Sequence, residues 1–154
     1  MSRAFVKEQD GEPEVETLPD RLVSTHPNLV TAEGLSSIEA EIAALEQARD
    51  AARAADDKLA QALAQRDLRY WASRHATAQV QPTPPKGEAQ FGARITIRRE
   101  DGREQTFRIV GEDEADPARH SVSYVSPLAR AVIGKGVGEA AMLNGAEIEI
   151  VAIG

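Results

Sequence analysis

Two adjacent carboxylates, Asp56 and Asp57, lie close to the midpoint of residues 31–80, a stretch with helix-forming composition. Carboxylate oxygens are hard ligands of the kind that Mg²⁺ prefers, and Mg²⁺ is often held by one or two carboxylates together with phosphates. A second metal ion can activate water and stabilise a leaving oxygen in a two-metal reaction. The alternative interpretation is structural, because Asp is a favoured N-cap and complements a helix dipole. The two interpretations are compatible, since an Asp that caps a helix at a turn is also presented there.

A second acidic cluster, Glu112–Asp116, and a short predicted helix supply the other candidate binding residues. A run of charges is usually a solvated loop, so we keep both a solvated loop and a binding loop as interpretations. Farther along the chain, Ser126 and Pro127 form the N-cap and first-turn pattern of a helix. That helix would bury Leu128 and expose Arg130.

Several kinds of chemistry are excluded by composition. The chain has no Cys, so it has no thiolate nucleophile and no Cys-based zinc site. His26, His75 and His120 are far apart and lack metal-ligand spacing. Composition thus excludes thiolate chemistry and a Cys- or His-based metal site. The further expectations, that the chain has no complete active site or metal site of its own, binds no cofactor alone and is not an enzyme, come from the resemblance described below.

Charge and hydropathy narrow the class of partner. The 154 residues carry a formal net charge of −7, with a pI near 5.0, which disfavours sequence-independent binding to duplex DNA. No apolar run approaches the ~18–20 residues of a membrane span. Residues 1–10 lack the apolar core of a signal peptide. We expect a cytoplasmic protein with no membrane partner.

Residues 31–80 must position the Asp56–Asp57 pair. Thr31 is a plausible N-cap, and an apolar seam with spacings of 3, 4 and 3 follows it. A single helix of ~46 residues would be ~69 Å long, too long for so small a partner domain to bury. The pattern therefore predicts an antiparallel helical hairpin that turns near Asp56. The seam residues of the first arm are Leu35, Ile38, Ile42 and Leu45; those of the second are Leu59, Leu63, Leu68, Trp71, His75 and Ala78. We expect Trp71 to pack between the hairpin and the rest of the chain, and Tyr70 to face the surface.

The flanking segments differ from the hairpin in composition. Residues 1–30 are acidic and Pro-containing, and are predicted to form an extended or disordered tail. Residues 81–87, with three prolines and a glycine, form a linker. Residues 88–154 alternate apolar and polar positions, with Asp101-Gly102 and Asn144-Gly145 as hairpin turns. The predicted fold class is α+β, with a helical hairpin followed by a small antiparallel β domain that carries one short helix.

The stretches FRIVGEDEAD, from Phe107, and VSPLARAVIGK, from Val125, together with the closing NGAEIEIVAI, resemble the bacterial GreA/GreB transcript-cleavage and elongation factors. The hairpin ends VTAEGL and AQV are also similar to the family, and the start MSRAFVKE resembles its GreB side more closely. The resemblance implies an FKBP-like fold for residues 88–154. It also implies that this domain docks on RNA polymerase at the rim of the secondary channel, which the hairpin enters.

Residue roles follow from the same resemblance. Tip acids of the family help to hold the second Mg²⁺ of the polymerase's own active centre, which assigns that tentative role to Asp56 and Asp57, with Mg²⁺ shared with the polymerase. A basic patch, here Arg98, Arg99, Arg103 and Arg108, would face nascent RNA and contact it only indirectly. The alternative is that these arginines are surface residues that keep the domain soluble. The implied polymerase-binding residues are Asp113, Glu114, Asp116, Ser126, Pro127, Ala129 and Arg130. The protein would act as a monomer.

The chain also departs from the family. The Gly-Asp-Leu-x-Glu-Asn type motif of the tip is missing, and the hairpin is about two turns shorter per arm, roughly 10–13 Å of reach. Short-armed relatives of the nucleoside diphosphate kinase regulator type are thus an alternative: they bind the same channel without strong cleavage and compete with cleavage factors. A prolyl isomerase of the FKBP type ranks third, because residues 88–154 contain only three aromatic side chains. A parallel coiled-coil dimer ranks fourth and would require an unbroken helix.

Overall fold

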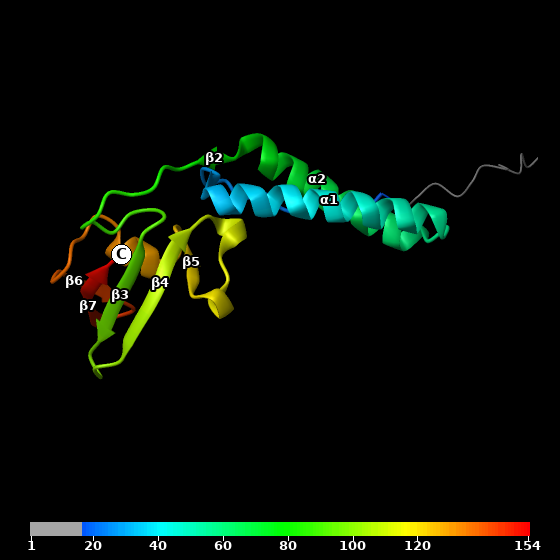
Figure 1. The fold of residues 1–154 in the computed structure, drawn as a ribbon. Coiled ribbons are helices and arrows are strands. Elements are labelled where there is room, and N and C mark those ends of the chain that lie inside the picture. The colour runs from blue at the N-terminus through cyan, green and yellow to red at the C-terminus, as the bar shows by residue number, and fades with distance from the viewer. Residues whose placement is uncertain (1–16) are drawn as a thin grey trace, which may run out of the picture.

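The computed structural model describes residues 17–154. Figure 1 shows two parts, a long helical hairpin and a small β domain beside one end of it. The predicted fold class, α+β with a helical hairpin followed by a β domain, is confirmed. No helix in the described part of the chain is long and apolar enough to cross a membrane.

The hairpin consists of α1 (Ala32–Ala54) and α2 (Lys58–Thr77), joined by the short turn Ala55–Asp57, which we call the tip. The Thr31 side chain caps α1 by accepting a hydrogen bond from Gly34 N at 3.0 Å. Asp57 caps α2 in the same way through Ala60 N at 3.0 Å. The break between the helices contradicts the parallel coiled-coil alternative, which needs an unbroken rod.

The second arm differs from the predicted packing. On α1, Ile38 is 2% exposed, as its place in the seam predicts. On α2, Leu59 and Leu63 are 66% and 39% exposed, and the His75 side chain is 47% exposed, so the placement of these three residues on the packed stripe was wrong. Gln61, Ala62 and Ala64 are buried instead. The face of α2 that meets α1 is thus rotated away from the two leucines, and small side chains fill it near the tip.

A two-residue parallel pairing joins the open ends of the hairpin. Strand β1 (Leu29–Val30) pairs with β2 (Gln79–Val80), in register Leu29 with Gln79. Residues 17–28, which form no helix or strand, precede β1 and contact α2. Residues 1–16 of the predicted acidic tail lie outside the described residues. Sequence reasoning missed the β1–β2 pairing because two-residue strands have no detectable alternation.

The β domain is one five-stranded sheet with the order β5-β4-β3-β7-β6. All neighbours are antiparallel except β4 and β5, which are parallel. The strands are β3 (Arg94–Arg99), β4 (Glu104–Val110), β5 (Ser121–Ser123), β6 (Ala140–Leu143) and β7 (Ala146–Ile153). Between β4 and β5 lie two single-turn 3-10 helices, Glu112–Glu114 and Pro117–Arg119, and α3 (Pro127–Val132) follows β5.

The core of the β domain lies between the sheet and α3. Ile95, Phe107 and Ile150 are fully buried from the sheet, and Ala129 and Val132 from α3. This alternation of buried and exposed residues along the strands is what fixes their register. The domain therefore has its own apolar core, independent of the hairpin, and can serve as a fixed base for it.

Candidate functional site

The tip places one carboxylate in solvent and uses the other structurally. Asp56 has a positive φ of 53°, and its side chain is 83% exposed. Asp57 lends its carboxylate to the first turn of α2. The capping interpretation is thus confirmed for Asp57, and Asp56 is the more freely presented acid. The whole tip lies at the end of the hairpin that points away from the β domain (Figure 1).

A cation already lies beside the exposed acid. Lys58 Nζ is 3.1 Å from Asp56 Oδ1. An exposed ion pair of this kind contributes about 0–1 kcal/mol, so a divalent ion could displace it. Two carboxylates leave most of an octahedral Mg²⁺ shell open, so a Mg²⁺ at the tip would need ligands from a partner. Within residues 17–154 no group of three or more His, Asp or Glu side chains could hold a metal ion.

The acidic loop Glu112–Asp116 is packed between the β domain and the hairpin, which corrects the solvated-loop interpretation. Asp113 accepts hydrogen bonds from the Tyr70 hydroxyl and from Arg74 Nε, the latter at 2.6 Å. Glu114 accepts from the backbone N–H and hydroxyl of Thr31. The charges of this loop are evident in the sequence, but nothing in the sequence indicates that Thr31, Tyr70 and Arg74 of the hairpin contact them.

Asp116 has local partners. Its side chain caps the 3-10 turn Pro117–Arg119 by accepting from Ala118 N at 3.0 Å, and Arg119 Nε lies 3.7 Å from its other oxygen. Because Arg119 is largely exposed, this pair contributes little to stability. Of the predicted acidic docking residues, Asp116 is thus the one whose carboxylate faces mainly local, exposed partners.

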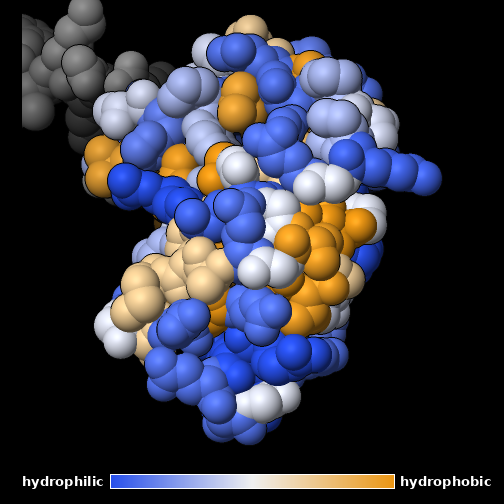
Figure 2. All heavy atoms as spheres, turned by 90° about the vertical axis from the view of Figure 1, so that its left-hand side faces the viewer, coloured by the Kyte–Doolittle hydropathy of each residue, from blue (hydrophilic) through white to orange (hydrophobic). Residues whose placement is uncertain are grey.

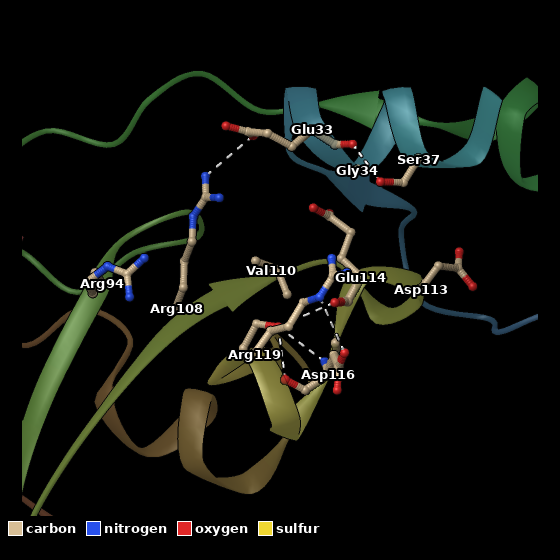
Figure 3. A pocket seen from close by; sticks show the side chains of 12 residues that line it. Glu33, Gly34, Ser37, Arg94, Arg108, Val110, Asp113, Glu114, Asp116 and Arg119 are labelled. Carbon is tan, nitrogen blue, oxygen red and sulfur yellow. Dashed lines mark hydrogen bonds and ion pairs between the residues drawn. The ribbon is translucent and has the colours of Figure 1, made fainter. Parts of the chain in front are cut away.

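An open cavity of about 500 Å³ lies between the start of α1 and the β domain. Figure 3 shows Arg108 reaching from β4 toward Glu33, with Arg94 beside it and Asp113 pointing away from the cavity. Arg108 Nη2 is 3.6 Å from Glu33 Oε2. A hydrogen bond within Glu33 itself, reinforced by the charge of Arg108, lowers the pKa of Glu33. Since both basic and acidic side chains line it, the cavity favours neither anions nor cations.

Helix α3 presents a different surface. Ser126 caps it through Ala129 N at 3.3 Å, as predicted. Pro127, Arg130 and Ile133 are exposed at intervals of three residues. Ala129, by contrast, is fully buried, so its side chain cannot contact a partner. That correction follows from the helical period, which turns position 129 toward the sheet.

Apolar side chains gather at this end of the β domain. Figure 2 looks onto it and shows a hydrophobic area among polar side chains. The exposed large apolar residues of the domain are Ile133, Val137 and Met142. An exposed apolar area rimmed by polar groups is typical of a protein-binding surface.

Of the four predicted basic-patch residues, Arg98 pairs with Glu104 at 3.1 Å and Arg103 with Asp101 at 2.6 Å.

Two residues of the site were missed or misplaced by sequence reasoning. Arg74 is 2% exposed, although arginine is almost never fully buried unless paired. Tyr70 was expected at the surface but is half-buried and bonds Asp113. Burial, reinforced by Asp113, raises the pKa of Tyr70 to about 12. The one available signal was the spacing of Tyr70 and Arg74, which places both on one face of α2.

Comparisons with known proteins find relatives of the β domain. Residues 84–154 match the family model described as transcription elongation factor GreA/GreB, C-terminal. The transcription elongation factor GreB of Neisseria meningitidis serogroup B is 46% identical over 67 residues, 41% of each chain. GreA of Francisella philomiragia is 49% identical over 59 residues, 38% of this chain and 37% of that protein.

These matches span about two fifths of the length of the curated relatives. Among solved structures, GreA factor homolog 1 (Gfh1) of Thermus thermophilus is similar at a TM-score of 0.40 and 16% identity, covering 84% of this chain and 99% of that one. The matched region, residues 84–154, contains the whole five-stranded sheet and α3. Residues 84–154 are therefore similar to the C-terminal domain of the GreA/GreB transcription elongation factors.

Proposed function

We propose that this protein binds bacterial RNA polymerase at its secondary channel and stimulates the polymerase's own cleavage of backtracked RNA. The β domain would dock at the channel rim and the hairpin would enter the channel. The observation that carries this proposal is the exposed Asp56 carboxylate at the far end of the hairpin. In this proposal the chain acts as a monomer, holds no complete active site and catalyses nothing by itself.

Asp56 would act at the metal. When Mg²⁺ is shared with the polymerase active centre, it supplies the activation of water and the stabilisation of the leaving oxygen. The side chain of Asp56 offers a hard oxygen ligand once Lys58 is displaced. Asp57 holds the turn that presents it, because its carboxylate caps α2. The two acids thus have different roles, ligand for Asp56 and support for Asp57.

Docking would use the exposed side of α3. Pro127, Arg130 and Ile133 are exposed along α3 and at its end, and Figure 2 shows a hydrophobic area among polar side chains on one face of the molecule. Asp113 and Glu114, which the resemblance also suggested, would have to give up internal hydrogen bonds to meet a partner. We therefore assign the polymerase-facing surface to α3 and its surroundings, with Asp116 at its acidic side.

A second candidate function has its own support. The non-cleaving alternative occupies the same channel and competes with cleavage factors. It is favoured by the length of α1, 23 residues or about 35 Å at 1.5 Å per residue, and by the ion pair that Lys58 makes with Asp56. Both features reduce the access of a tip carboxylate to a metal deep in a partner.

Halted, backtracked elongation complexes test the two candidates. Wild-type protein, Asp56→Asn and the control Asp50→Asn, an exposed acid near the end of α1, would be added in Mg²⁺. If Asp56 is a ligand, wild type and Asp50→Asn release short 3′ RNA fragments and Asp56→Asn does not. If none of the three cleaves but all displace a bound cleavage factor, the competitor function holds. If none associates with the polymerase, both candidates are wrong.

A further inference from the structure

Asp113 of the β domain is held by two side chains from the same helix. The Tyr70 hydroxyl donates to one carboxylate oxygen, and Arg74 Nε donates to the other at 2.6 Å. Tyr70 and Arg74 are one helical turn apart on α2. The side chains of Arg74 and Asp113 are only 2% and 10% exposed. The contact is therefore specific in geometry as well as in charge.

The burial of this contact makes it strong. Charge-assisted hydrogen bonds are shorter and roughly twice as strong as neutral ones. Glu112 adds a second carboxylate 3.8 Å from Arg74 Nη2. Because water is largely excluded, removal of one partner would leave the other charge buried and uncompensated. A lysine could not replace Arg74 equivalently, since it lacks the planar fork of donors.

The segment before β1 backs this contact from the outside. The guanidinium of Arg21 stacks 4.0 Å from the centre of the Tyr70 ring and lies 3.5 Å from Asp67. Ser24 donates to Glu112 at 2.9 Å. Residues 17–28 thus contact both the acidic loop and the part of α2 to which that loop is bonded.

A small tilt of the hairpin at its base produces a large displacement of the tip. Asp57 and Arg74 are the cap and a late residue of α2, about 26 Å apart at 1.5 Å per residue. A tilt of about 10° at Arg74 would move the tip by about 4.5 Å over that distance. That displacement is larger than a metal–ligand bond, so the tip carboxylate is useful only if the base is held.

We propose that Tyr70, Arg74 and Asp113 form a positioning clamp that sets the direction in which the hairpin leaves the β domain. Asp113 of the acidic loop then holds the hairpin and does not face the partner. Only the effect of the clamp on polymerase activity rests on the proposed function. Its geometric effect belongs to the free protein and can be measured there.

Electron–electron distance measurements on spin labels test the clamp directly. The chain has no Cys, so Gln47→Cys near the tip and Ala146→Cys in the β domain, both exposed, give two unique labels. We expect a single narrow distance distribution in the parent and in the control Arg66→Lys, whose partner Asp67 lies on the same helix. Arg74→Lys and Tyr70→Phe should lose that narrow distribution and give a broad one.

Two checks separate the clamp from misfolding and from the proposed function. Helical circular dichroism and the spectrum of the β domain should be unchanged in Tyr70→Phe, which removes a single hydroxyl and decides the matter if Arg74→Lys does not fold. A narrow, unshifted distribution in folded Tyr70→Phe and Arg74→Lys would overturn the clamp. If wild-type protein does not bind the polymerase while the two variants show the broadened distributions, the proposed function is wrong and the clamp stands.

Discussion

The hairpin carries acidic residues at both ends, and the two sets behave in opposite ways. At the tip, Asp56 is exposed and forms an ion pair with the cation of Lys58. At the base, Asp113 is nearly buried and held by a tyrosine and an arginine. The difference arises from the neighbouring element: no other element within residues 17–154 packs on the tip, whereas α2 packs on the acidic loop. An acidic cluster therefore indicates function only after its internal partners are known.

The largest expected effect is a difference in the free energy of unfolding between substitutions at the base and at the tip. Arg74→Ala leaves Asp113 and Glu112 without their buried cation and should lower the free energy of unfolding by about 3–5 kcal/mol. Lys58→Ala, at the tip, should change it by less than about 1 kcal/mol. Urea titrations followed by circular dichroism measure both. Equal effects would mean that the base is no more structural than the tip.

Apolar truncations extend the comparison to the seam of the hairpin. Ile38→Ala removes a side chain that is 2% exposed and should destabilise by about 2–5 kcal/mol. Leu59→Ala, 66% exposed near the tip, should stay within about 0.5 kcal/mol. Thermal and urea unfolding give the values. A large loss at Leu59 would show that this leucine is covered in solution.

The two tip acids should differ from each other. Asp57→Ala removes the cap of α2 and should destabilise by about 1 kcal/mol. Asp56→Gly should stabilise slightly, because glycine adopts a positive φ more readily than aspartate does. In the cleavage assay Asp56→Gly should nevertheless be inactive, since its carboxylate is gone. Retained cleavage in that variant would rule out Asp56 as the ligand.

The ionisation of Tyr70 affects stability only at high pH and has the smallest effect near neutral pH. Its pKa is raised to about 12, mainly by burial and then by Asp113. A raised pKa means that folding favours the protonated phenol, so this stabilisation is complete below pH ~10 and is lost as the pH rises from ~10 to ~12. Tyr70→Phe should flatten the fall in stability over that range. The phenolate absorbance near 295 nm, compared between the two proteins, follows the same ionisation.

Sequence alone predicted those features that depend on local chemistry. The capping Asp57, the turn beside it and the alternating strands β3, β4 and β7 all follow from short-range preferences of their residues. Features that depend on distant partners were missed. Burial of Arg74 depends on carboxylates 38 and 39 residues away, and nothing near Arg74 in the sequence announces them. The exposed Leu59 shows the reverse error, since apolar character alone does not say which helix face will be covered.

The pairing of β1 with β2 has a consequence for how this protein could diversify. Leu29–Val30 and Gln79–Val80 lie side by side, so the chain leaves the base and returns to it at one place. Adding seven residues to each arm would lengthen the projection by about 10.5 Å while both attachment points stay where they are. The length of the hairpin can therefore change to match the depth of a channel while the β domain and its contacts with the hairpin stay the same.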